Sequence, residues 1–280
     1  MVAREMNHIP QITARRMRPL PGLGKIGVIA LNTFRESVRD RVLYNLVLFV
    51  LILVGASIFI SELSVNQEAK FIATLGLSAM LVFGALIAIF IGVGLVYKEI
   101  ERRTIYNLLS KPVHRHEFII GKYLGLCLTL LVNSLVMLAA IELALMYVNQ
   151  GFTSLQAPVL VAGLLIYLEL ALLVAIALMF SSFSTPMLSA LFTFALYVIG
   201  HFSADLKLAA SLSPSFVVRG ALNVAYYLLP NLKNFNFISQ ASHGDAINAA
   251  HVVWAVVYAV VYISVLLSAA VLIFQRRNFK

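Results

Sequence analysis

Two acidic residues stand alone inside long apolar stretches of this chain. Glu142 lies in the apolar run 123–147, and Glu169 lies in the apolar run 157–180. An acid in an apolar environment is costly, so it normally faces the interior of a bundle or a wet cavity. No lysine or arginine lies inside either run, but Asn133 offers a hydrogen-bond partner in the first. We expect these three residues to line a polar pathway or a proton-linked site; a structural hydrogen bond from a protonated acid is the alternative.

Other residue types that perform chemistry are poorly placed for it. His114 and His116 are two residues apart and point to different sides of a helix, whereas zinc ligands on one helix usually stand four apart. Cys127 is the single cysteine, which excludes a disulfide framework or a CxxC metal site. Three further histidines lie in segments assigned below to the outer face: His201, His243 and His251. The sequence therefore predicts neither a catalytic site nor a metal site.

The composition indicates which kind of structural element positions these residues. Hydrophobic residues make up 61% of the 280 residues, and charged residues only 12%. A soluble domain carries about 25% charged residues, so this chain has half the charge that would cover a globule in water. Lipid is the expected solvent, and the predicted fold class is an all-α integral membrane protein.

Six runs are long and apolar enough to cross a bilayer, which takes about 20 residues at about 1.5 Å each. The predicted spans are 42–60, 71–97, 123–147, 157–180, 186–202 and 250–274. The fourth and fifth are separated by SSFSTP at 181–186, where Ser184 or Thr185 can cap a new helix with Pro186 in its first turn.

The basic residues orient the six spans. Of the 21 lysines and arginines, 17 fall in the N-terminal tail, the loop 98–122 and the C-terminus, and four fall in the loops on the other side. Positive charge is retained in the cytoplasm, so both termini and the 98–122 loop are predicted to be cytoplasmic. The predicted location is the cytoplasmic (inner) membrane of a bacterium or archaeon.

The N-terminus divides into two parts. Residues 1–24 are expected to form a flexible basic cytoplasmic tail, and residues 25–41 an interfacial amphipathic helix. The apolar residues of this helix lie near one side: Val28, Leu31, Phe34 and Val38. The charged residues lie opposite: Glu36, Arg39 and Asp40.

The external segment 203–249 is the only long one on the predicted outer side. Its first part, 205–230, is apolar but interrupted by prolines, and short helices that dip into the outer leaflet are expected there. The next part, NLKNFNFISQASHGD, is polar and is predicted to be a loop.

The loop KEIERRTIYNLLSKPVHRHEFIIGK at 98–122 contains a short helical pattern ended by proline, which suits docking to a cytoplasmic partner as well as fixing topology. Together with the preceding basic helix and the six spans, it resembles the ABC-2-type permeases, which have the type V exporter fold. The matching residues are Glu99, Glu101, Thr104, Leu108, Leu109, Ser110, Pro112, Arg115, Glu117, Gly121 and Lys122. Arg103 stands where the family usually has glycine.

The resemblance implies a transport subunit that performs no covalent chemistry. The loop would hold a coupling helix docked in a separate ATPase subunit, and a second permease copy or a sister permease would complete the transporter. Glu99 or Glu101 would pair with the interfacial helix at Arg35 or Arg39. The chain has no GxxxxGK[ST] phosphate loop, so it is expected to bind no cofactor itself, with ATP and Mg on the partner ATPase.

Two other readings remain open. An ATPase-independent transporter or channel would use Glu142 and Glu169 as ion or proton sites, although no internal repeat is evident. A subunit that only anchors a complex is the third class. The sequence does not choose among substrates.

Overall fold

The computed structural model describes residues 22–39, 48–49, 52, 55, 67–101, 114–213 and 215–276. Within this part of the chain the secondary structure is helical and no β-strand occurs. Most of the predicted first span, 42–60, and the segment 102–113 lie outside the described residues. The predicted all-α fold class is confirmed for the described residues.

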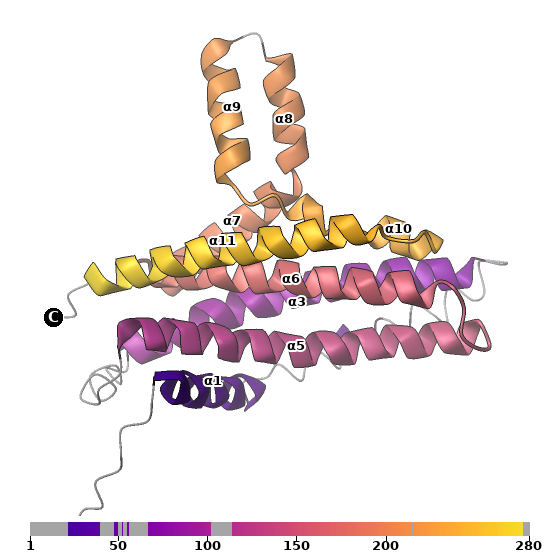
Figure 1. Ribbon diagram of the computed structural model, residues 1–280, viewed down its shortest axis with the longest axis horizontal. Coiled ribbons are helices and arrows are strands. Elements are labelled where there is room, and N and C mark those ends of the chain that lie inside the picture. The colour runs from indigo at the N-terminus through magenta and orange to yellow at the C-terminus, as the bar shows by residue number, and fades with distance from the viewer. Residues whose placement is uncertain are drawn as a thin grey trace, which may run out of the picture.

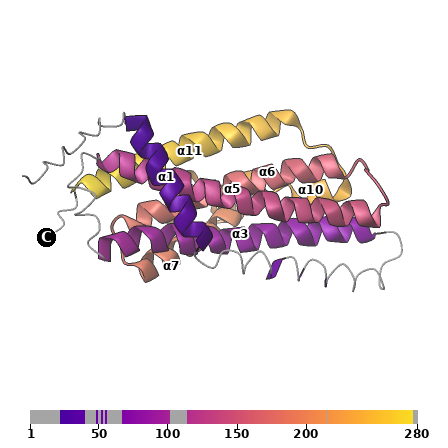
Figure 2. The ribbon, with the colours of Figure 1, turned by 90° about the horizontal axis from the view of Figure 1, so that it is seen from below.

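Four long helices lie side by side in an elongated bundle (Figures 1 and 2). They are α3 (Glu68–Glu101), α5 (Arg115–Val148), α6 (Gln156–Ser181) and α11 (Ala249–Arg276). Each of the four is long and apolar enough to cross a membrane. They contain the predicted spans 71–97, 123–147, 157–180 and 250–274. The predicted 98–122 loop differs at both of its ends, because residues 98–101 belong to α3 and residues 115–122 form the first two turns of α5.

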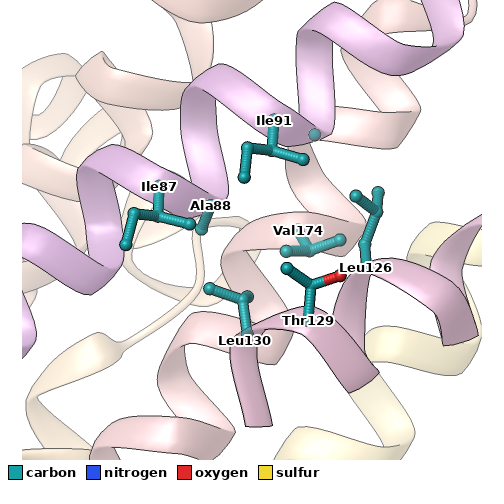
Figure 3. A pocket seen from close by; sticks show the side chains of 8 residues that line it. Ile87, Ala88, Ile91, Leu126, Thr129, Leu130 and Val174 are labelled. Carbon is teal, nitrogen blue, oxygen red and sulfur yellow. The ribbon is translucent and has the colours of Figure 1, made fainter. Parts of the chain in front are cut away.

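Helix α6 forms the centre of the bundle. In its most apolar stretch 72% of the residues are buried, whereas in that of α11 only 17% are buried. The reason lies in its sequence, since α6 is apolar on all sides and contacts α3, α5 and α11 at once. Where it meets α3 and α5, a small gap lined by Ile87, Leu126 and Val174 leaves no room for a bound molecule (Figure 3).

The helix break predicted at 181–186 is confirmed. Helix α6 ends at Ser181 and α7 runs from Pro186 to His201, with Thr185 as the N-cap residue and Pro186 at the first position. The Thr185 side chain makes no capping hydrogen bond; Ser184 instead donates to Phe180 O at 2.9 Å. With 16 residues, α7 is about 24 Å long, shorter than the hydrocarbon core of about 30 Å.

After α7 the chain leaves the bundle as a helical hairpin. Helices α8 (Ser203–Leu212) and α9 (Phe216–Leu228) pack against each other and project from the side of the bundle (Figure 1). Short helices were predicted within 205–230, and α8, which begins at Ser203, and α9 are found there; their position relative to the outer leaflet stays a prediction.

The chain then returns along the bundle in a form that the sequence analysis missed. The segment predicted as a polar loop contains a 3₁₀ helix, η1 (Leu232–Phe235), and α10 (Ile238–His243). Its apolar residues recur at every third position and are buried: Leu232, Phe235, Ile238 and Ala241. Gly244 ends α10 at φ +78°, a conformation that glycine adopts without strain. The spacing of these four residues was the signal for a helix-like segment.

Candidate functional site

Helix α1 (Gly22–Arg39) crosses the start of α5 in close contact (Figure 2). Two glycines on α5, one turn apart, make the approach possible. A Cβ atom on Gly125 would lie 2.5 Å from the carbonyl oxygen of Ala30, and one on Gly121 would lie 2.8 Å from Cβ of Ile29. Neither site has room for a side chain, so the glycines set the distance between the two helices.

Two ion pairs of opposite direction join the same helices. Lys25 Nζ of α1 lies 3.9 Å from Glu117 Oε2 of α5, and Lys122 Nζ of α5 lies 3.8 Å from Glu36 Oε2 of α1. Both α5 residues are buried, so each charge requires a partner that replaces water. Lys25 and Glu36 are three helical turns apart on one face of α1. The two pairs therefore fix the register of α1 along α5.

Arg115 connects α5 to the last helix. Its Nη1 donates to the carbonyl oxygens of Phe274 and Gln275, at 2.8 and 2.9 Å. Beside it the rings of Phe118 and Phe274 stack at a centroid distance of 5.9 Å, and both side chains are buried. We call α1, the first turns of α5 and the end of α11 the cytoplasmic clasp, after the side of the membrane that the sequence predicts for it. Its contacts are those of residues 25–36, 115–125 and 270–275.

A second polar contact lies in the middle of the bundle. Glu169, midway along α6, is fully buried, and its Oε1 atom lies 3.3 Å from Nε2 of His201 at the end of α7. The other ring nitrogen, Nδ1, lies 3.1 Å from the carbonyl oxygen of Tyr197. A carbonyl oxygen only accepts, so Nδ1 carries a proton and Nε2 faces the carboxyl group.

The assignment of His201 to the outer face was wrong. Helix α7 is too short to carry its last residue to the outer end of the bundle, and the side chain therefore meets α6 halfway along its length. His243, in contrast, is exposed at the end of α10, and His251 is exposed in the first turn of α11.

A comparison with protein-family models decides the family. The model described as ABC-2 family transporter protein matches residues 28–279, nearly the whole chain. The chain belongs to this family. No curated protein matches it. As an ABC-2 family transporter protein it is a membrane protein and a transport component, which confirms the resemblance inferred from the 98–122 loop.

The residues that the resemblance assigned to ATPase coupling fall into two groups in this ABC-2 transporter. Those outside the described residues are Thr104, Leu108, Leu109 and Pro112, and the side chains of Glu99 and Glu101 are not described. Those within α5 take part in the cytoplasmic clasp: Arg115, Glu117, Gly121 and Lys122.

The predicted pairing of Glu99 or Glu101 with α1 stays a prediction. Arg35 is exposed on α1, whereas Asp40 and the side chain of Arg39 lie outside the described part. The partners on α1 that the sequence analysis missed are Lys25 and Glu36. No spacing in the sequence indicated them, because Lys25 and Glu36 are eleven residues apart on α1, whereas Glu117 and Lys122 are five apart on α5.

The three residues proposed as a pathway lining are not gathered in one place. Asn133 and Glu142 are nine residues apart on α5, which puts them on opposite faces and about 13 Å apart along the axis. Asn133 Nδ2 donates to Thr129 O of its own helix at 3.0 Å. Glu142 is half-buried, and Glu169 meets His201 instead.

Proposed function

We propose that this chain is the permease subunit of an ATP-driven exporter and that a separate ATPase moves it through the segment 102–113. The observation that supports this proposal most directly is the cytoplasmic clasp. The clasp begins at the residues that follow that segment, so a force on the segment reaches α1 and α11 through packed side chains. The match to the ABC-2 transporter family supports an ATP-driven transporter as the source of such a force.

The proposal includes a membrane arrangement. Both termini lie in the cytoplasm of a bacterium or archaeon, and six crossings span its inner membrane. Helix α7 makes the inner part of the fifth crossing, and η1 with α10 completes it after the α8–α9 hairpin. The exposed apolar side of α1, which includes Val28 and Leu31, faces the lipid headgroup layer. A second copy or a sister permease completes the transport unit, and ATP with Mg binds the partner ATPase.

The test is co-purification from the native host in mild detergent. We expect an ATPase with a phosphate-binding loop to accompany the tagged chain, and the double change Leu108→Asp with Leu109→Asp to release it. An apolar docking helix loses its fit when two charges enter it. The matched control places two acids at exposed positions at the other end of the bundle, Tyr147→Asp in the last turn of α5 with Phe152→Asp in the loop after it, and leaves the ATPase bound.

The readout is mass spectrometry of the eluted complex together with its ATP hydrolysis rate. The folded state of each variant is checked by size-exclusion chromatography. Absence of an ATPase even after chemical crosslinking, or its retention by the Leu108 and Leu109 variant, contradicts the proposed coupling.

A further inference from the structure

We infer that Arg115 is a positioning residue that ties the last helix, α11, to the base of the coupling segment, so that α1, α5 and α11 move as one block. This inference rests on the proposed function. Arg115 then acts within the permease, where it passes force from α5 to α11, and does not contact the ATPase directly.

The contact has the chemistry of a helix cap. The last four carbonyl groups of a helix have no partner within it and carry partial negative charge. Arg115 supplies a cation and two hydrogen bonds to two of these groups, Phe274 O and Gln275 O. Hydrogen bonds from charged donors are the stronger kind, and this one is made by a group that is half-shielded from water. The end of α11 is therefore held by a side chain of α5.

Apolar packing makes the contact a rigid one. Phe118 stacks on Phe274, and Ile119 and Ala270 are buried in the same cluster. A neighbouring face of the same α5 turns carries Gly121 and receives α1. Closely packed side chains transmit displacement because they cannot be compressed without strain. Two helices are thus attached to α5 within its first three turns.

The position of Arg115 in the chain gives the contact its function. It lies two residues after the segment 102–113, so a displacement of that segment reaches it before any other α5 contact with α11. Helix α11 also packs against α6, but only 17% of its most apolar stretch is buried, so the contact at Arg115 is a substantial part of what holds its last turns to α5. Without the tie, α5 could move while the cytoplasmic end of α11 stayed behind.

The experiment measures the distance between α5 and α11 by pulsed electron resonance in lipid nanodiscs. Spin labels replace two exposed residues, Leu128 on α5 and Leu272 on α11, in a background where Cys127 is changed to Ala. In the otherwise unaltered chain we expect one narrow distance distribution. In the complex with the co-purified ATPase we expect the same distance distribution in two states, without nucleotide and after trapping with ATP and vanadate.

Arg115→Ala is expected to broaden this distribution several-fold and to make it shift on trapping. The ATPase should stay bound, while transport-linked ATP hydrolysis falls several-fold. Arg115→Lys retains a cation with several donors on a shorter side chain, so it should restore most of the narrow distribution. His116→Ala is the matched control, because His116 is the exposed neighbour on the same turn and should change neither readout.

Two failures are distinguishable. If Arg115→Ala leaves the distribution as narrow as His116→Ala does, the tie is refuted whatever the ATPase does. If no ATPase accompanies the unaltered chain, the proposed function fails, and the role of Arg115 in force transfer falls with it. The nucleotide-free distances then report only whether Arg115 holds α11. A shift on trapping in the unaltered chain would also overturn the single block.

Discussion

At the scale of single residues, the cytoplasmic clasp depends on two glycines as much as on its charged side chains. Gly121 and Gly125 have no side chain in the contact with α1, and that absence lets backbone approach backbone. Glycines alone would let α1 pack at several positions along α5. The two ion pairs select one of these registers. Arg115 adds the link to α11.

Gly125→Ala should weaken the contact between α1 and α5. The new methyl group would meet the carbonyl oxygen of Ala30 and Cβ of Thr33, and overpacking of this kind costs about 1–3 kcal/mol. We expect a lower thermal unfolding midpoint in detergent and faster proteolysis of α1. Gly27→Ala is the control, because nothing lies within 4 Å of a Cβ there, and the loss of a helical glycine stabilises by about 0.5–1 kcal/mol. Equal effects of the two changes would contradict a close contact at Gly125.

The pair of Lys122 with Glu36 should show a measurable coupling. Lys122 is buried, whereas the Glu36 side chain is 38% exposed, so solvent weakens the pair and about 1 kcal/mol is expected. The measurement is a double-mutant cycle with Lys122→Met and Glu36→Gln, read from unfolding in detergent. Effects that simply add would show that the two charges do not interact.

At the scale of elements, the polar contact between α6 and α7 explains how a short helix keeps its place. Helix α7 ends inside the bundle, where its last residue would otherwise bring a polar ring into apolar surroundings. Glu169 meets that ring, and each group lowers the cost of burying the other. The contact lies where the chain departs into the α8–α9 hairpin.

A double replacement should therefore be better tolerated than either single one. We expect Glu169→Leu and His201→Phe each to lower the unfolding midpoint, since one buried polar group then lacks its partner. The double variant should recover most of the loss, because an apolar pair needs no partner. Glu169→Gln keeps a hydrogen-bonding group and should remain folded, and full ATP-driven transport in this variant would exclude a proton-carrying role. Additive losses in the double variant would contradict the contact.

At the scale of the whole molecule, the proposed topology places the cytoplasmic clasp on one side of the membrane and the α5–α6 loop with the end of α10 on the other. The long helices α3, α5, α6 and α11 impose this separation, because each is long and apolar enough to cross the hydrocarbon core.

Single cysteines test this topology in intact cells. In a chain with Cys127 changed to Ala, His116→Cys should be protected from a membrane-impermeant thiol reagent, whereas Phe152→Cys and His243→Cys should react. All three positions are exposed, so protection reports the membrane and not burial. Cell lysis should make His116→Cys reactive. Labelling of His116→Cys in intact cells would reverse the orientation.

Much of this protein follows from the sequence by itself. Hydropathy is a local property, so the four long helices and the break before Pro186 could be predicted from neighbouring residues. The pattern from Glu99 to Lys122 identified the family. The spacing of Leu232, Phe235, Ile238 and Ala241 also indicated a helix-like segment, although the polar residues between them led to the wrong prediction of a loop.

Only the tertiary structure decided which residues meet. Lys122 with Glu36, Arg115 with the end of α11 and Glu169 with His201 are separated along the chain by many residues of helix. Their contacts depend on where helices cross and how far each one reaches, and periodicity contains no information about either. A crossing point depends on the shapes of both helices, and here it is set by two glycines on α5 and by the length of α7.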